Sequence, residues 1–578
     1  MIISKIKEAL LLIEKNDKKK FKKLCYLIIF GGLIELISVT FLYQIIKIFS
    51  LGPKINEDKF TNIVSEFFDI IEFVDILFLF SLLLLSIFLI KVIYFTYLNL
   101  YQNKFIFNLQ SSLTKKLFNH YINQNFLFHL NTNSSKILRN LKDDVSLFCV
   151  GVIQPVANII LELFVILLIV SFLIYIEPTI VFFSLFFLIF FSSVYFFIIK
   201  KKILFLGNSR QEVLTKIIKS IQQGVFGIRD IKLLNKEKLF TNYLSIYSDK
   251  LAKISTSLVT LQHFPRIGLE FLIILVFVTS IIASGIDENN YKNSIQIIGL
   301  FAISSLRLLP SINKILISLQ NMRSNIPSVN VIKSNLDKKI DFKNNVSSFS
   351  SNLNFNKSIL IKNLNFSYSS ETKNIFNDLN LLIKKNEMIG LLGSSGSGKS
   401  TLVDIITGLL NVSNGEISVD GKNIHSNLSA WQSKIGYVSQ STYLLDETLE
   451  KNIAFNLNEN DIDGEKIKRC LAMSDLDNLV MSLPDKKKSI VGEMGAKLSG
   501  GQIQRIGIAR ALYNNPEILI FDEATSALDL ITENKILDTI QKLKSKKTII
   551  IISHRVSAVK FCDNVYSLED GKLKNDEL

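Results

Sequence analysis

Six apolar stretches, each long enough to cross a lipid bilayer as a helix, occupy most of the chain before residue 320. A membrane span needs about 20 residues with few charges. The stretches run near 24–46, 74–98, 146–171, 173–199, 262–285 and 295–318. Spans this long and charge-poor have no common equivalent in water-soluble proteins, which disfavours six buried helices of a soluble domain. The sequence therefore predicts a membrane domain with six transmembrane helices.

The distribution of charge predicts how these spans are oriented. The net charge is +15, and many of the Lys and Arg residues flank the spans. Basic residues precede the first span, lie between the second and third, and follow the fourth, whereas the links after the first and fifth spans are acidic. Since Lys and Arg are enriched on the cytoplasmic side, both termini are predicted to be cytoplasmic. The excess of basic residues is then explained by their position beside the lipid bilayer, on the cytoplasmic flanks of the spans, and no nucleic-acid partner is expected.

The remaining pattern divides the chain into domains. Residues 99–145 and 200–260 keep helical periodicity, so the middle spans are expected to continue into the cytoplasm as helices. We predict a transmembrane domain with an N-terminal amphipathic helix over 1–333 and a linker rich in Ser, Asn and Lys over 334–355. Residues 356–578 alternate strand and helix patterns, which predicts an α/β domain with a largely parallel sheet.

A glycine-rich loop in this second domain has the pattern of a phosphate-binding loop. The strand-like run Met388–Leu392 leads into Gly-x-x-x-x-Gly-Lys-Ser, and a helical segment follows. The loop amides and the helix N-terminus would face phosphate oxygens, with Lys399 at the β- and γ-phosphates and Ser400 on Mg²⁺. The candidate nucleotide-binding residues are Gly393, Ser394, Ser395, Gly396, Ser397, Gly398, Lys399, Ser400 and Thr401.

Two further motifs point to nucleotide chemistry. The apolar strand 517–521 ends in Asp522 and Glu523, where Asp522 would organise Mg²⁺ and Glu523 would polarise an attacking water. Leu498-Ser-Gly-Gly-Gln502 opens a predicted helix and supplies a second helix N-terminus able to bind an anion. One nucleotide on one phosphate loop does not require that second site.

Together these motifs closely resemble the nucleotide-binding domain of ABC transporters, and the region before them resembles the membrane domain of an exporter half-transporter. The resemblance implies ATP and Mg²⁺ as ligands, Glu523, His554 and Gln440 as catalytic residues, and Gln440 as a further Mg²⁺ contact beside Ser400 and Asp522. It implies that Tyr368 stacks on adenine. It also implies that the signature of one chain completes the ATP site of another, most simply in a homodimer; the residues are Ser499, Gly500, Gly501, Gln502 and Asp529. Met494 stands where such exporters commonly have an arginine.

The cargo is less constrained than the ATPase site. Cationic residues inside the predicted spans, Lys91 and Arg307, would suit an anionic head group facing a cavity. Short segments such as 227–235 and 307–313 resemble bacterial flippases of lipid-linked oligosaccharides, which predicts an amphiphilic or lipid-linked cargo and a bacterial cytoplasmic membrane location. The alternatives are a multidrug or peptide exporter and, in a different class, a nucleotide-gated channel or regulatory membrane receptor.

Overall fold

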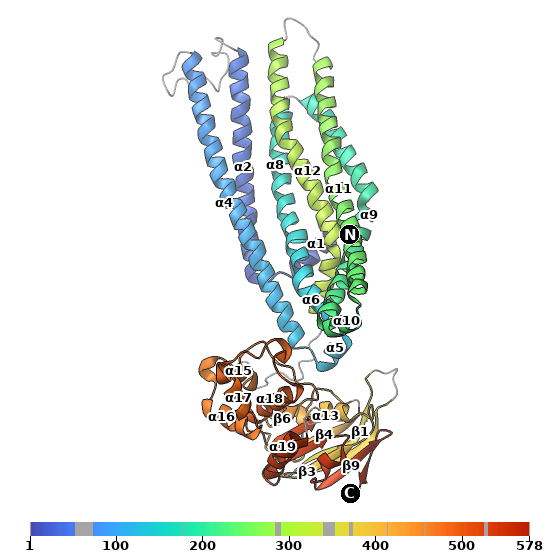
Figure 1. Ribbon diagram of the computed structural model, residues 1–578. Helices are drawn as coiled ribbons and strands as arrows, with labels where there is room; N and C mark the ends of the chain where they lie inside the picture. The colour runs from blue at the N-terminus through green and yellow to red at the C-terminus, as the bar shows by residue number, and fades with distance from the viewer. Residues whose placement is uncertain are drawn as a thin grey trace. The chain divides into compact units, whose positions relative to one another are not determined.

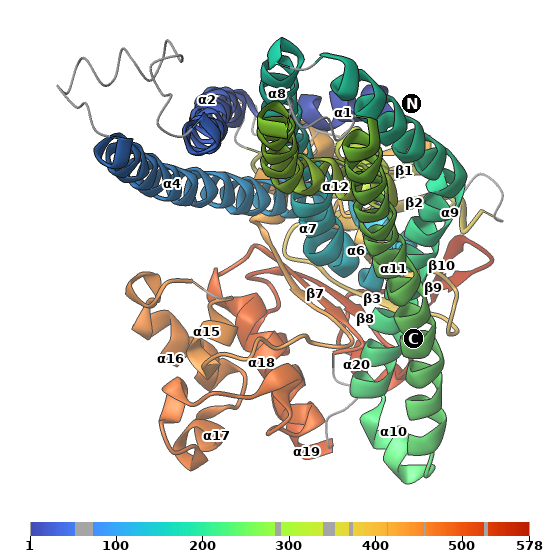
Figure 2. The same cartoon turned by 90° about the horizontal axis from the view of Figure 1, so that it is seen from above.

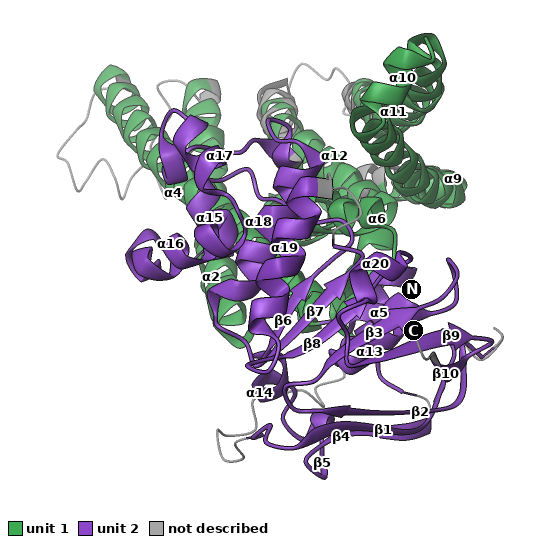
Figure 3. Ribbon diagram, turned by 60° about the horizontal axis from the view of Figure 1, so that its bottom comes forward, with its two compact units in different colours: residues 1–123, 132–339 green, residues 124–131, 340–578 purple. Residues whose placement is uncertain are grey.

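The chain divides into two compact units in the computed structural model (Figure 3). Unit 1 comprises residues 1–123 and 132–339, and unit 2 comprises residues 124–131 and 340–578. The short helix α5 (Phe126–Asn131) therefore groups with the second unit, although the helices on both sides of it in sequence belong to the first. The structure describes residues 2–51, 73–176, 178–283, 291–338, 353–368, 374–412, 414–455, 457–524 and 530–576.

Unit 1 is helical, and six of its described helices are between 23 and 50 residues long (Figure 1). These six are α2 (Lys15–Leu51), α4 (Phe73–Ile122), α8 (Gln154–Ile176), α9 (Pro178–Phe226), α11 (Glu237–Ala283) and α12 (Tyr291–Leu336). The shorter ones are α1 (Ile2–Leu11), α6 (Ser134–Arg139), α7 (Val145–Phe148) and α10 (Ile228–Leu233). The helical membrane domain predicted from sequence is confirmed.

The long helices pack in two overlapping groups within unit 1. The helices α9, α11 and α12 contact one another, and α2 contacts α4, α8 and α12 (Figure 2). By length and composition, three segments of the described residues can cross a membrane, namely Lys15–Phe49, Val74–Ile122 and Ser134–Ile176. The helices α4, α9 and α11 extend well past the apolar stretches, as the periodicity predicted.

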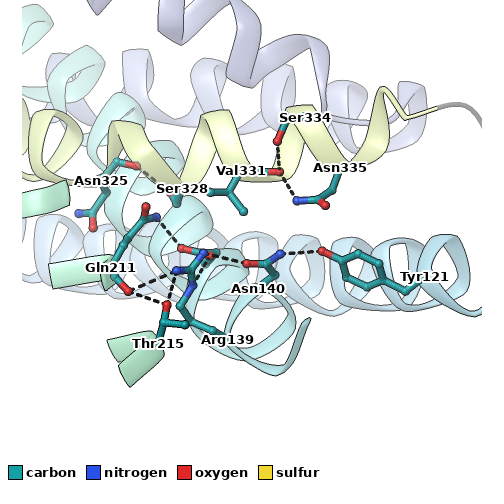
Figure 4. A network of polar contacts seen from close by, with 11 residues as sticks. Tyr121, Arg139, Asn140, Gln211, Thr215, Asn325, Ser328, Val331, Ser334 and Asn335 are labelled. Carbon is teal, nitrogen blue, oxygen red and sulfur yellow. Dashed lines mark hydrogen bonds and ion pairs between the residues drawn. The ribbon is translucent and has the colours of Figure 1, made fainter. Parts of the chain in front are cut away.

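A network of buried and half-buried polar side chains joins three segments of unit 1, at a place where the helical hydrogen-bonding pattern is irregular (Figure 4). Arg139 Nε lies 3.1 Å from Asp144 Oδ2, and Gln211 of α9 donates to the other oxygen of Asp144 at 2.7 Å. Asn140 donates to the hydroxyl of Tyr121 on α4 at 2.7 Å. The residues 140–144 and 149–153 form two π turns, which widen the helix by one residue each. The charged pair is thus satisfied inside the protein.

Unit 2 contains two sheets, and the larger one carries the predicted motifs. Its strand order is β10-β9-β3-β8-β7-β6, parallel except at the β9–β10 edge. Its strands are β3 (Met388–Leu392), β6 (Ile435–Val438), β7 (Ile518–Asp522), β8 (Thr548–Ile552), β9 (Asn564–Glu569) and β10 (Lys572–Asp576). The antiparallel sheet has the order β2-β1-β4-β5, with β1 (Ser358–Phe366), β2 (Phe376–Lys384), β4 (Asn414–Val419) and β5 (Lys422–Asn423).

Alternating side chains of the parallel strands enter two separate cores. Leu519 and Ile549 pack in the first core, beneath α18 (Gly500–Tyr513) and α19 (Leu530–Leu543). Ile520 and Ile550 pack in the second core, with α13 (Lys399–Ile406) and the antiparallel sheet. Strands that are covered on both faces consist of continuous apolar residues, which explains the apolar runs in the sequences of β7 and β8. The helices of unit 2 are α5, α13 (Lys399–Ile406), α14 (Leu428–Gln432), α15 (Leu449–Ile453), α16 (Gly464–Met473), α17 (Asp477–Ser482), α18 (Gly500–Tyr513), α19 (Leu530–Leu543) and α20 (Val556–Val559).

Ile550, in the middle of β8, is fully buried and gives a graded test of this core. Ile550→Ala is expected to lower the free energy of unfolding by about 2–5 kcal/mol and Ile550→Val by about 0.5–1.5 kcal/mol, because each leaves a cavity of a different size. Trp431 is the chain's single tryptophan and lies fully buried in the same core, so its fluorescence during denaturation follows unit 2. Identical unfolding curves for both variants and the wild type would contradict this placement.

Candidate functional site

The four motifs that carry chemistry follow the carboxyl ends of parallel strands, so they meet at one edge of the sheet in unit 2. The phosphate loop follows β3, Gln440 follows β6, Glu523 follows β7 and His554 follows β8. Loops at the carboxyl ends of parallel strands are where open α/β sheets bind ligands. The strand predicted over 517–521 begins and ends one residue later, and Asp522 still pairs in the ladder with Ile552.

The phosphate loop has the backbone geometry that its glycines allow. Gly398 caps α13 with a φ of 104°, and a Cβ at this position would lie 2.8 Å from Ile375. The Lys399 ammonium donates to the carbonyl oxygens of Gly393 at 2.8 Å and Ser394 at 2.9 Å, so it lies folded along its own loop. Burial lowers the pKa of Lys399, while the nearby carboxylates of Glu523 and Asp522 act in the opposite direction.

Asp522 is a buried carboxylate with two hydroxyl partners. Ser400 Oγ lies 3.5 Å from one carboxylate oxygen, and the Tyr437 hydroxyl donates to the other at 3.2 Å. Burial is the largest factor that raises the pKa of Asp522, and it also raises the pKa of Tyr437. The contact between Tyr437 and Asp522 was not predicted from the sequence, because the two residues belong to different strands.

The hydroxyl of Ser400 and the carboxylate of Asp522 are oxygen donors of the kind that Mg²⁺ prefers. The described residues contain no cluster of three or more His, Cys, Asp or Glu side chains that could hold a metal by themselves. Such a cluster is not needed for Mg²⁺ at a phosphate loop, because that ion is held by one or two protein groups together with phosphate and water. The residues present therefore fit the ion.

Glu523 connects two of the predicted catalytic residues. The side-chain amide of Gln440 donates to one of its carboxylate oxygens at 2.7 Å, and His554 Nε2 is paired with the other. The second ring nitrogen of His554 lies 3.2 Å from the carbonyl oxygen of Gly393, so the histidine bridges Glu523 and the phosphate loop. The backbone of Glu523 has a φ of 49°, a left-handed conformation that is uncommon outside glycine and is found at active sites.

Tyr368 lies near the phosphate loop but has contacts of its own. Its hydroxyl is 3.0 Å from Thr401 Oγ1, and its ring meets that of Phe366 edge-on at a centroid distance of 5.2 Å. The predicted stacking of this ring on adenine stays a prediction.

The signature segment forms a regular helix N-terminus. Ser499 caps α18 and accepts a hydrogen bond from the Gln502 amide at 3.3 Å, while the Gln502 side chain accepts one from Ser499 N–H at 2.8 Å. Ser499 and Gly500 are exposed, so the cap is accessible. Asp529 and the side chain of Met494 lie outside the described residues.

The two cations proposed for cargo lie in unit 1 and are both paired with carboxylates. Lys91 Nζ is 3.0 Å from Glu35 Oε1, and Arg307 pairs with Glu35 and, at 3.4 Å, with Glu162. Lys314 lies 2.9 Å from Glu162. These ion pairs were not predicted from the sequence, because the carboxylates belong to other helices. Arg266 pairs within its own helix, where its Nε lies 2.8 Å from Glu270 one turn away.

Two family models match this chain, one over its helical unit and one over the domain that carries the phosphate loop. The description "ABC transporter transmembrane region" matches residues 23–307, and "ABC transporter" matches residues 376–526. The chain belongs to the ABC transporters. One transmembrane region followed by one nucleotide-binding domain is the arrangement of a half-transporter, as predicted.

The structure of this ABC transporter chain has the exporter fold. A bacterial Atm1-family ABC exporter with ATP bound superposes with a TM-score of 0.78 over 96% of this chain and 94% of that chain, at 19% identity. The leukotoxin translocation ATP-binding protein LktB of Mannheimia glucosida is 42% identical over 216 residues, and that of Mannheimia haemolytica is 41% identical over 216 residues. Both matches cover 37% of this chain and 30% of the relative, so the chain matches less than a third of their length.

A half-buried carboxyl close to the site predicts a pH dependence of stability. Burial raises the pKa of Asp404 from 3.8 to about 6, and the Asp522 carboxylate acts in the same direction. Between these values the folded chain holds a proton that the unfolded chain releases, so this group's contribution to stability falls as pH rises through the window. Asp404→Asn cannot ionise, and it is expected to gain stability relative to the wild type on going from about pH 4.5 to pH 7.5. Trp431 fluorescence during denaturation at both pH values measures this difference; an unchanged difference would contradict it.

Proposed function

We propose that this chain is one half of an ATP-driven exporter that hydrolyses ATP to ADP and phosphate. The observation that carries the proposal is the contact of Glu523 with both Gln440 and His554 at the carboxyl edge of the sheet, with His554 also on the phosphate loop. A carboxylate held beside a phosphate loop by two polar side chains is suited to orient a water molecule for attack on the γ-phosphate. The alternative of a nucleotide-gated channel or receptor does not require this arrangement.

Each residue has a distinct task in this proposal. Lys399 leaves its loop carbonyls and binds the β- and γ-phosphates, together with the loop amides. Glu523 accepts a hydrogen bond from the attacking water, and Gln440 and His554 hold its carboxylate in place. Ser400 and Asp522, with Gln440, would hold Mg²⁺, which neutralises phosphate charge when it is bound.

The ATP site requires a second chain. The signature residues Ser499, Gly500, Gly501 and Gln502, with Asp529, are proposed to contact the nucleotide held by another copy, which makes a homodimer the simplest assembly. The exposed cap of α18 supports this assignment because a helix N-terminus that is accessible can bind phosphate. We place the dimer in a bacterial cytoplasmic membrane with the nucleotide-binding domains on the cytoplasmic side.

Glu523→Gln tests the catalytic assignment. The amide keeps the shape of the side chain but cannot accept a proton from water, so ATP turnover should fall by at least about 100-fold while nucleotide binding is retained. Phosphate release and nucleotide binding are measured on the reconstituted chain. The matched control is Glu517→Gln, which makes the same change just before the opposite end of β7, where Glu517 pairs with Lys434. Near-normal turnover in Glu523→Gln would exclude Glu523 as the water-orienting residue.

Two observations bear on the cargo. The cluster of Lys91, Arg307 and Lys314 with Glu35 and Glu162 has three cations and two carboxylates, and this excess of one positive charge supports a cargo with an anionic group, such as a lipid-linked oligosaccharide. The names of the LktB relatives favour the alternative of polypeptide export. Their match of 216 residues is shorter than the transmembrane match of 285 residues, so it cannot include the whole cargo pathway.

Arg307→Ala in liposomes separates these cargo classes. If an anionic lipid carrier is the cargo, the variant should lose flipping by about 10-fold or more while basal ATP hydrolysis changes less, because a charge-assisted contact to the cargo is removed. Arg266→Ala is the matched control, since Arg266 pairs on its own helix with Glu270. Equal loss of flipping and hydrolysis would count against a cargo role for Arg307. Translocation of a peptide instead of the lipid would establish the polypeptide alternative.

A further inference from the structure

The segment that follows Gln440 is fixed against helix α18. This segment, Ser441–Thr448, connects Gln440 to α15 in unit 2. A Cβ atom built at Gly507 of α18 would lie 2.4 Å from Thr442 Oγ1, so the Thr442 side chain packs directly against the backbone of α18. Leu444 packs in the first core together with Ile506 of the same helix. The loop therefore lies along the helix that begins at the signature.

Asn452, in α15, closes this segment into a compact turn. Its side chain is fully buried, and its oxygen accepts a hydrogen bond from Leu445 N–H at 2.8 Å. Its nitrogen donates to the carbonyl oxygens of Leu445 at 3.0 Å and Thr448 at 3.1 Å. Replacing this amide by an apolar side chain would remove all three hydrogen bonds, and the Leu445 N–H would lose its acceptor.

Arg510, near the end of α18, joins the helix to that turn. Its Nε donates to the Asn452 carbonyl oxygen at 2.8 Å, and its Nη1 donates to the Tyr443 carbonyl oxygen at 2.9 Å. The guanidinium also lies over the ring of Phe455, 4.9 Å from its centroid. Arginine holds the two carbonyls with two different nitrogens of one rigid, planar fork, a fixed geometry that the single nitrogen of a lysine ammonium does not impose.

We infer that Asn452 and Arg510 are positioning residues that couple the signature helix to Gln440. The inference rests on the proposed function and its dimer. In that dimer, Ser499 at the start of α18 contacts the nucleotide of the partner subunit, while Gln440 contacts this chain's own nucleotide. Eleven helical residues, about 16 Å, separate Ser499 from Arg510. We call Asn452 and Arg510 together the clamp. When α18 shifts on contact with the partner's nucleotide, the clamp transmits the shift to Gln440, and Gln440 transmits it to Glu523 at this chain's own nucleotide.

The inference predicts a loss of turnover and of cooperativity, without loss of nucleotide binding. In the full-length chain reconstituted in liposomes, Arg510→Lys and Asn452→Ala should each lower kcat by about 10-fold to 100-fold with little change in KM for ATP, because Gln440 is misplaced. The dependence of rate on ATP concentration should become less cooperative. Since both residues belong to one clamp, the double variant should lose little more than either single variant.

Arg505→Lys is the matched control for Arg510→Lys. Arg505 lies on the same helix and also donates to a backbone carbonyl, but its partner is Asp475, away from the Gln440 segment. It should keep both kcat and cooperativity. Unfolding followed by Trp431 fluorescence shows whether each variant is folded. Arg510→Lys is expected to fold, because it keeps the positive charge of the side chain.

The outcomes distinguish this inference from the proposed function. A wild-type chain without ATP turnover would overturn the proposed function, and the inference with it. If the wild type hydrolyses ATP and Arg510→Lys has the same kcat and the same cooperativity, the inference is overturned but the proposed function is not. Equal losses in Arg505→Lys and Arg510→Lys would also overturn it, since they would show a general effect on α18.

Discussion

The parallel pairing of β8 with β3 on one side and β7 on the other determines where the groups of the nucleotide site lie. Since all three strands run the same way, the phosphate loop, Glu523 and His554 emerge at one edge. His554 stands at the end of the middle strand and reaches the loops of both neighbours. The strands are held in this register by side chains buried on both faces, so the position of the site depends on the packing of apolar residues far from any nucleotide.

In unit 1, two carboxylates that pair with cations on other helices determine how the long helices pack against one another. Glu35 and Glu162 are each only 2% exposed, and Arg307 pairs with both. Ionised groups within a membrane domain are costly unless they are paired, so these residues constrain the rotation of α2, α8 and α12 about their axes. The same pairing explains how a span can contain Arg307 without a charge left unpartnered. Any cargo that contacts this cluster must compete with an existing ion pair.

Polar side chains fix irregular backbone in a similar way in the two units. The pair Arg139–Asp144 in unit 1 and the residues Asn452 and Arg510 in unit 2 each fix a segment of irregular backbone against a neighbouring helix. In both places the hydrogen-bond partners are backbone carbonyls or side chains that apolar packing alone would leave unsatisfied. Such networks define one arrangement, whereas apolar contacts tolerate several.

The amino-acid sequence was enough to predict the class of fold, the strand β3, the strand β7 to within one residue, and the nucleotide-binding motifs. These features are local, because a phosphate loop or a buried strand is specified by neighbouring residues. The tertiary structure decided which distant groups meet. Lys91 and Arg307 acquired carboxylate partners, Tyr437 became a partner of Asp522, and Arg510 joined α18 to the Gln440 segment. The reason is geometric: periodicity gives the apolar face of a helix, but the rotation and depth at which it packs against another helix follow only from the assembled fold.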